Sequence, residues 1–207
     1  MNKVELIGHY GSDKTIALSA WTSTYRDLSA DKKKRIPTLI RSLWKDGHET
    51  PFEKSGIHFL ITTDIATHIH LLKHRIGVSV NAESARYKEI QEDKYLIPED
   101  WPKEWQEKLE QASIQTNKLY HEAVAQLTPR LGRKRAKESA RFFKMYNSQI
   151  TSDVMFNMRS FGHFLKLRNS KHAQLEIREL AQQMVLQVQQ IKRNPFKTTI
   201  EVICNYS

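Results

Sequence analysis

The first part of the chain alternates between strand-like and helix-like spacing of its apolar residues. "KVELIGHY" at residues 3–10 alternates Val4 and Leu6 with polar neighbours, which predicts a short strand. "IHFLITT" at residues 57–63 predicts a second strand. Between them, residues 36–44 repeat apolar side chains along one helix face, with Pro37 expected in the first turn and Gly47 just past the end.

A further helix is expected directly after the second strand. Asp64 can cap a helix that runs to about Arg75, with Ile65, Ile69 and Leu72 facing inward. Residues 77–81 are expected to lead the chain away from this helix.

The second half of the chain has mostly helical spacing. A helical phase runs from Trp105 to Ala123, Gly132 interrupts it, and a shorter helix follows. Two more apolar stripes predict helices, and "FKTTIEVIC" at residues 196–204 predicts a final strand. The stripes are formed by Val154, Met158, Phe161 and Leu165, and by Ala173, Ile177, Leu180, Met184, Val188 and Ile191. The whole pattern predicts one helix-rich α+β domain over residues 1–207, with a small antiparallel or mixed sheet.

The charge balance favours anionic partners. The 207 residues include 33 Lys and Arg against 23 Asp and Glu, a formal net charge of +10, which suits nucleic acids, nucleotides and phosphorylated cofactors alike. No run is long and apolar enough to span a membrane, and "MNKVELIGHY" does not resemble a signal peptide, so a cytoplasmic location is expected. Cys204 is the single cysteine and is expected to be a half-buried strand residue.

The densest candidate chemistry lies in "LLKHRIGVSVNAESARYKE", residues 71–89. Arg75 and Arg86 carry planar forks that match phosphate or carboxylate, and neighbouring Ser and Asn side chains add neutral donors and acceptors. No glycine-rich phosphate loop is present, so side chains would have to hold a dinucleotide. Taken by itself, this segment reads more readily as a solvated basic loop.

His70 and His74 have the i, i+4 spacing of two zinc ligands on a helix. The H-E-x-x-H signature is absent, and no third ligand is evident nearby. Non-metal roles are therefore favoured, and no metal is expected.

Two more segments are unusually polar. "GHETPFEK" at residues 47–54 clusters His48, Thr50 and Glu53, which a helix stop followed by a proline turn does not explain. Residues 138–176 are expected to form two consecutive helices, where helical phase gathers Asn157, Phe161, Phe164 and Arg168. Three such segments along one chain suggest a composite site.

Together, these segments resemble the flavin-dependent thymidylate synthases. That family is marked by R-H-R and, after seven residues, by the Ser of S-x-R-Y; here Lys73-His74-Arg75 precedes Ser84-Ala85-Arg86-Tyr87. "GHETPFE" and "FNMRSFGHFLKLRNSKHAQLEIRELA" are similar to the family's upstream and downstream segments. The resemblance runs in order from roughly Ser23 to Ala181.

The resemblance implies an activity, cofactors and partners. The activity is reductive methylation of dUMP to dTMP, with FAD as cofactor, methylenetetrahydrofolate as carbon donor and NADPH as reductant. The partners are dUMP and further copies of the chain, in a homotetramer whose sites are shared between subunits. Neither a membrane nor nucleic acid is implied.

The resemblance also assigns residues to roles. Arg168 would act at the uracil, Ser84 would orient the nucleotide because no activating base is evident beside it, and His48 would help position the folate near the flavin ring. The residues expected at the flavin are Ser23, Thr50, Glu53, Lys73, His74, Arg75, Asn157, Arg159, His163 and His172. Those expected at the nucleotide are His70, Ser84, Ala85, Arg86, Arg141 and Arg168, with Arg86 and Arg141 nearest the phosphate.

The motif departs from the family pattern in several ways. Lys73 keeps the charge of the first Arg but loses its fork. Eight residues instead of seven separate Arg75 from Ser84, so the chain is expected to bulge near Gly77 or Val78. In addition, Ala82 stands where a family glutamate is expected, with Glu83 beside it, and His70 stands where Gln is expected.

Two alternatives stay open at this point. The longer segment before Ser84 is compatible with a related flavin-dependent methylase or hydroxymethylase that acts on another pyrimidine nucleotide. The net charge and the basic cluster at residues 133–137 are compatible with a nucleic-acid-binding module without catalysis.

Overall fold

The computed structural model describes residues 2–84, 86–90 and 92–205. The chain divides into two compact units, which are described separately. The large unit consists of Lys3–Ile61, Leu71–Val80 and Asp153–Ser207, and the small unit of Met1–Asn2, Thr62–His70 and Asn81–Ser152. The chain was expected to form a single domain, which stays a prediction.

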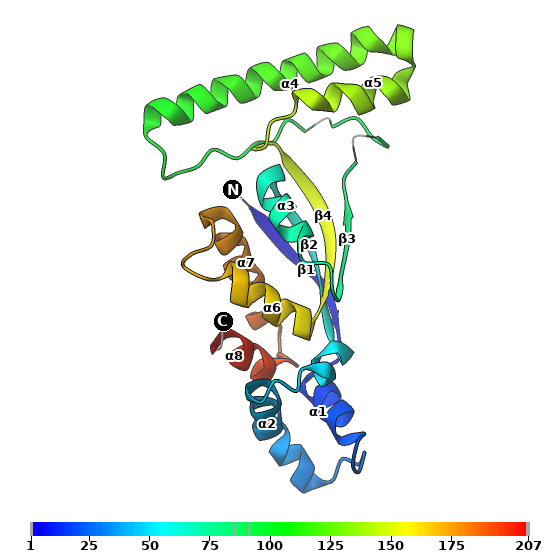
Figure 1. The fold of residues 1–207 in the computed structure, drawn as a ribbon, viewed down its shortest axis with the longest axis vertical. Helices are drawn as coiled ribbons and strands as arrows, with labels where there is room; N and C mark the ends of the chain where they lie inside the picture. Colours follow the sequence, from blue (N-terminus) through cyan, green and yellow to red (C-terminus); the bar gives the residue numbers. More distant parts are fainter. Residues whose placement is uncertain (1, 85, 91, 206–207) are drawn as a thin grey trace. The chain divides into compact units, whose positions relative to one another are not determined.

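A four-stranded sheet has the strand order β1-β2-β4-β3 (Figure 1). Its strands are β1 (Lys3–Tyr10), β2 (Gly56–Asp64), β3 (Val78–Ala82) and β4 (Gln149–Asn157). The expected strands at residues 3–10 and 57–63 are confirmed, and the small sheet with many helices confirms the α+β class.

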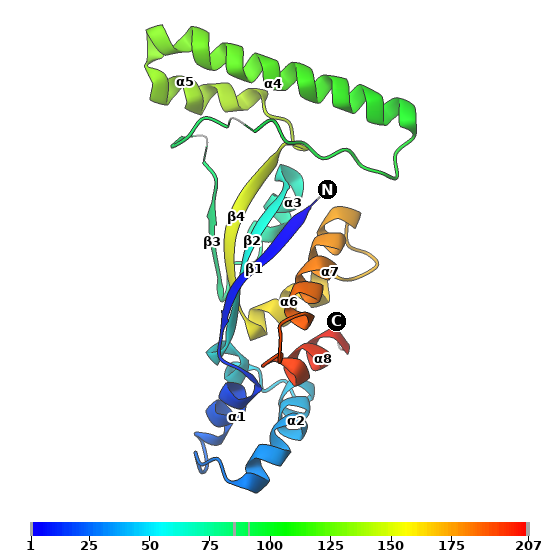
Figure 2. The ribbon, with the colours of Figure 1, turned by 180° about the vertical axis from the view of Figure 1, so that it is seen from behind.

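The helices of the large unit surround an aromatic core. They are α1 (Asp13–Trp21), α2 (Ala30–Lys45), the 3-10 helix η1 (Thr50–Lys54), α6 (Met158–Arg168), α7 (Leu175–Gln189) and α8 (Lys197–Asn205). Helices α6 and α7 lie over the same face of the strands in both views (Figures 1 and 2), and α7 contacts β1. Phe59, Phe156, Phe161 and Phe164 are fully buried there, with neighbouring rings 5.4–6.4 Å apart between centroids.

Helix α6 comes very close to α2 at one point. A Cβ at Gly162 would lie 2.2 Å from Cη2 of Trp44, so only glycine fits there without movement of the indole. Trp44 also packs edge-on against the buried Phe52 of η1, with ring centroids 5.1 Å apart. The contact joins α6 to α2 and η1, which lie far earlier in the sequence.

The small unit is built on a helical hairpin. Helix α4 (Lys103–Leu131) ends at Gly132, whose φ of 76° suits glycine, and α5 (Arg133–Ala140) folds back along it (Figure 1). A short 3-10 turn, η2 (Arg141–Phe143), follows. The unit also contains most of α3 (Ile65–Leu72), which Asp64 caps by accepting the Thr67 N–H at 2.9 Å, as expected.

Two expected elements are wrong in type. Residues 149–157 form strand β4 and not a helix, because buried Ser152, Val154 and Phe156 alternate with exposed neighbours at a period of two. Residues 197–205 form helix α8 and not a strand. Its first turn is capped from a distance, since the Asp13 carboxylate accepts the N–H groups of Thr198 and Thr199 at 2.8 and 3.1 Å.

Two details of the expected helices are also corrected. Helix α2 starts at Ala30 after the capping Ser29, so Pro37 lies inside the helix and not in its first turn. Helix α3 ends at Leu72 and buries Thr67, His68 and Leu71, whereas Leu72 is exposed. Within the described residues, no helix combines the length and apolar character needed to cross a membrane.

Candidate functional site

A cleft of about 550 Å³ lies in the large unit. It is lined by residues of η1, of the connection between α3 and β3, and of α6. Eight of its residues were expected from the sequence, namely Glu53, Lys73, His74, Arg75, Asn157, Arg159, His163 and Arg168. Segments that are separate in the sequence therefore meet at one site.

The α3–β3 connection is held against the start of α6 by a tight turn. Gly77 has a φ of 67°, and a Cβ there would lie 2.2 Å from Asn157 Nδ2 and 2.3 Å from Ser160 Oγ. The Asn157 N–H donates to the Gly77 carbonyl at 3.0 Å, and Ser160 Oγ donates to the Ile76 carbonyl at 2.6 Å. The turn thus fixes the segment that carries Lys73, His74 and Arg75, at the place where a bulge was expected.

His74 and Arg168 are in direct contact. Arg168 Nε donates to His74 Nε2 at 3.0 Å, and the buried imidazole packs edge-on against Phe164 with centroids 5.0 Å apart. Burial, together with the positive charge of Arg168 and the neighbouring His163, lowers the pKa of His74 to about 4. At neutral pH the ring is therefore uncharged, and its Nε2 lone pair is free to accept from the guanidinium.

This lowered pKa predicts a pH-dependent stability. Unfolded His74 binds a proton near pH 6.5, whereas the folded residue does so only near pH 4. We expect the free energy of unfolding to be highest above pH 6.5 and to fall between pH 6.5 and 4. In urea titrations, His74→Gln should lessen this slope by up to about 1.4 kcal/mol per pH unit. Part of the slope should remain, because burial also lowers the pKa of His68. Identical slopes for both proteins would contradict the assignment.

Arg159 is held by two carboxylates. Its Nε lies 2.9 Å from Glu49 and its Nη1 2.6 Å from Glu53, and these hydrogen bonds raise the pKa of the guanidinium. Glu49 lies in the polar "GHETPFEK" segment but was not singled out from the sequence. Four cations (Lys73, Arg75, Arg159 and Arg168) thus line the cleft with two carboxylates, a balance that fits the diphosphate of a flavin dinucleotide.

Residues expected at the nucleotide phosphate lie in the small unit. Arg86 Nε contacts Glu138 at 3.1 Å, and Arg141 follows three residues after Glu138, in the exposed turn η2. Ser84 Oγ accepts the Arg86 N–H at 3.2 Å, and its role at the nucleotide stays a prediction. Among the described residues, nothing hydrogen-bonds the buried Nδ1 of His70. Ala85 lies outside the described residues.

Four of the residues expected at the flavin or the folate do not line the cleft. Ser23 and Thr50 are exposed after α1 and at the start of η1, and His48 and His172 are exposed in connecting segments. Conversely, Ile76, Val78, Ser160 and Leu167 line it without having been singled out, although Ser160 belongs to the quoted "FNMRSFGHF" stretch. In residues 2–84, 86–90 and 92–205, no group of three or more His, Cys, Asp or Glu side chains could hold a metal ion.

Comparison with known proteins decides the family. A relative from Pseudothermotoga lettingae, named flavin-dependent thymidylate synthase, is 34% identical over 214 residues, covering 98% of this chain and 90% of the relative. A family model described as "Thymidylate synthase complementing protein" matches residues 5–192. The chain belongs to the flavin-dependent thymidylate synthase family.

A second relative and a solved structure agree with the family and with the fold, respectively. A flavin-dependent thymidylate synthase from Streptomyces avermitilis is 30% identical over 182 residues, 80% of this chain and 74% of the relative. The crystal structure of the UMP/dUMP methylase PolB from Streptomyces cacaoi, bound with 5-Br UMP, has a TM-score of 0.75 at 24% identity, covering 100% of this chain and 95% of that one. The expected family, enzyme class and fold are confirmed, and a flavin is the cofactor in the family's name.

Proposed function

We propose that this chain catalyses reductive methylation of dUMP to dTMP, with FAD as bound cofactor, methylenetetrahydrofolate as carbon donor and NADPH as reductant. The observation that carries the proposal is the 3.0 Å contact between Arg168 and His74. It joins the arginine expected at the uracil to the histidine of the flavin motif, within one positively charged cleft.

The chain's own residues have distinct parts in this reaction. Arg168 stabilises negative charge that develops on the pyrimidine ring, and neutral His74 keeps the guanidinium in place by accepting its Nε–H. Ser84 orients the nucleotide, and His48 helps position the folate. His70, whose buried Nδ1 has no hydrogen-bond partner among the described residues, contributes to the nucleotide pocket.

A bound flavin supplies the hydride chemistry, while the protein binds and orients it. Lys73 and Arg75 lie at the cleft as cations for the diphosphate, and Asn157 and His163 supply polar groups beside them. Arg159 and Glu53 also line the cleft and contact each other at 2.6 Å. Ser23, Thr50 and His172 would complete the flavin site from other copies of the chain.

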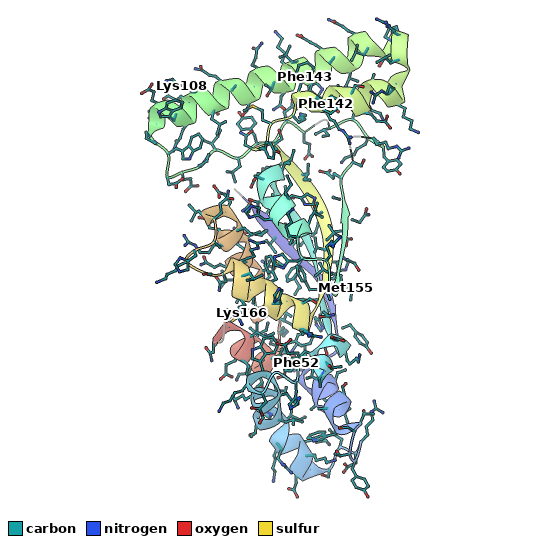
Figure 3. All side chains as sticks on the ribbon, viewed as in Figure 1. Phe52, Lys108, Phe142, Phe143, Met155 and Lys166 are labelled. Carbon is teal, nitrogen blue, oxygen red and sulfur yellow. The ribbon has the colours of Figure 1, made fainter. Side chains whose placement is uncertain are left out.

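The homotetramer is part of this proposal. Tyr87 and Phe142 of the small unit are 80% and 81% exposed, and Tyr146 is 69% exposed. Phe142 and its neighbour Phe143 follow α5 (Figure 3). Exposed aromatic side chains of this size are typical of surfaces that pair with another protein.

The activity is tested by release of tritium from C5 of labelled dUMP, because methylation at C5 displaces that hydrogen. We expect release that requires FAD, methylenetetrahydrofolate and NADPH together. UMP and dCMP, assayed beside dUMP, provide the comparison. No turnover of dUMP together with turnover of another nucleotide would overturn the proposal.

That second outcome is the rival function, a methylase or hydroxymethylase of another pyrimidine nucleotide. Lys73 in place of Arg and the longer segment before Ser84 favour it, and the name of the structural neighbour includes UMP as well as dUMP.

A non-catalytic nucleic-acid-binding module is distinguished by the colour of the purified protein. Purified protein with a flavin absorbance band excludes it, whereas colourless protein that binds DNA with a steep salt dependence would favour it.

A further inference from the structure

The segment between β3 and α4 carries Ser84 and Arg86, yet its described residues up to Lys94 form neither helix nor strand. Backbone hydrogen bonds fix its two ends: Glu83 donates to Thr151 at 2.9 Å, and Leu96 donates to Asn147 at 2.8 Å. We refer to residues 83–96 as the nucleotide loop. Side chains from α4, α5 and the turn after them hold its middle.

Lys144 is the centre of this arrangement. Its side chain is only 5% exposed, and Nζ donates to Asp93 Oδ1 at 2.9 Å and to Asn117 Oδ1 at 2.7 Å. The ammonium also lies 4.4 Å from the ring centroid of Tyr120. A buried ammonium is costly unless all these partners are in place, so the contact strongly favours one arrangement of the loop.

Asp93 is held from a second side as well. His121 Nε2 of α4 lies 3.0 Å from each of its carboxylate oxygens. Burial raises the pKa of Asp93, but the hydrogen bonds from Lys144 and His121 outweigh this and lower it overall. Asp93 therefore stays ionised at neutral pH and keeps its attraction for Lys144.

Helix α5 holds the part of the loop that precedes Asp93. Arg133 lies 3.2 Å from Glu89, and Lys137 Nζ donates to the Tyr87 carbonyl at 3.0 Å. Arg86 itself contacts Glu138 at 3.1 Å. The loop is thus tied to the helix directly before Arg141.

Lys144 also closes the turn that presents Arg141, because its own N–H donates to the Arg141 carbonyl at 3.0 Å. One residue therefore fixes the turn of Arg141 through its backbone and the loop of Arg86 through its side chain. We infer that Lys144 and Asp93 are positioning residues that set the relative placement of Arg86 and Arg141 for a single nucleotide phosphate. This inference rests on the proposed function.

The test uses full-length, flavin-loaded protein and the variants Lys144→Gln and Asp93→Asn. Each should raise the KM for dUMP by about 5- to 50-fold, with kcat changed by less than about 2-fold, because the phosphate site is misplaced while the chemistry is not. The double variant should be no worse than the poorer single variant, since both remove the same contact. Asp93→Asn keeps the size of the side chain at a partly exposed position, and urea unfolding of both variants checks that each is folded before kinetics are compared.

A second readout separates positioning from general structural damage. Competition with 2′-deoxyuridine, which lacks the phosphate, should be unchanged in both variants, whereas dUMP binding weakens. Lys108→Gln is the matched control, because Lys108 also contacts a carboxylate (Glu104, 2.5 Å) and an aromatic ring (Trp105, 4.5 Å). It lies near the start of α4, whereas the α4 residues that contact Lys144 or Asp93, namely Asn117, Tyr120 and His121, lie further along the helix.

The outcomes are distinct. Weaker dUMP binding with unchanged deoxyuridine binding, absent in the Lys108 variant, supports the inference. Equal losses for both ligands, or no loss for dUMP, overturn it while leaving the proposed function intact. If the wild-type chain bound no pyrimidine nucleotide, the proposed function would fall and this inference with it.

Discussion

Arg141→Ala is expected to weaken equilibrium binding of dUMP by about 10- to 100-fold, because it removes the charged hydrogen bonds proposed between Arg141 and the phosphate, worth about 1.5–3 kcal/mol. Arg141 is exposed in η2, three residues after the glutamate that holds Arg86. Flavin content should not change, since the expected flavin residues that line the cleft lie in the large unit. A dUMP titration of flavin-loaded protein, followed by the flavin absorbance, measures both.

Arg130→Ala is the matched control for this experiment. Arg130 is an exposed arginine in the last turn of α4, so its loss changes the net charge equally without touching the proposed phosphate site. Unchanged dUMP binding in the Arg141 variant would remove Arg141 from the nucleotide site. Equal losses in both variants would point to the overall charge of the chain instead.

Gly77→Ala is expected to lower flavin uptake at least about tenfold and to destabilise the large unit. The left-handed conformation alone costs an alanine about 1–2 kcal/mol. In addition, its Cβ would collide with Asn157 and Ser160, which hold the turn against the start of α6. The turn must then move, and with it the segment of Lys73, His74 and Arg75. Absorbance of bound FAD per protein, together with urea unfolding, measures the two effects.

Gly132→Ala is the matched control, because it introduces the backbone strain of a left-handed alanine without displacing neighbouring side chains. Gly132 has a similar φ of 76°, but nothing lies within 4 Å of the position that its Cβ would occupy. The control should therefore lose some stability and keep its flavin. If Gly77→Ala retained full flavin content, the turn would not be needed to place the motif.

The spacing of apolar residues along the chain was sufficient to predict those elements whose own residues form a regular buried face. The strand at β2 and the long stripe of α7 were predicted because each repeats apolar side chains at its own period. The end of strand β4 was mistaken for part of a helix because Val154 lies four residues before Met158, the first residue of α6, and so happens to fit the helical spacing. Helix α8 was missed because its cap is Asp13, which no local window contains.

The candidate site likewise contains residues that the sequence identifies and contacts that the sequence does not reveal. Lys73, His74 and Arg75 stand out because they are adjacent in sequence and match a family motif. The contact of Arg168 with His74 spans 94 residues and depends on the turn at Gly77. Glu49 was overlooked because its importance comes from Arg159, which lies far away in the sequence. Pairings of this kind follow from packing, and a single sequence does not display them.

The close approach of α6 to α2 has a consequence for how this enzyme can diverge. Gly162 leaves no room for a side chain while the Trp44 indole lies against it, so a methyl group can be accepted only if that ring moves or is replaced by a smaller one. The residues at the two positions are therefore expected to change together. In a set of descendants, a residue larger than glycine at position 162 should be accompanied by a smaller residue at position 44.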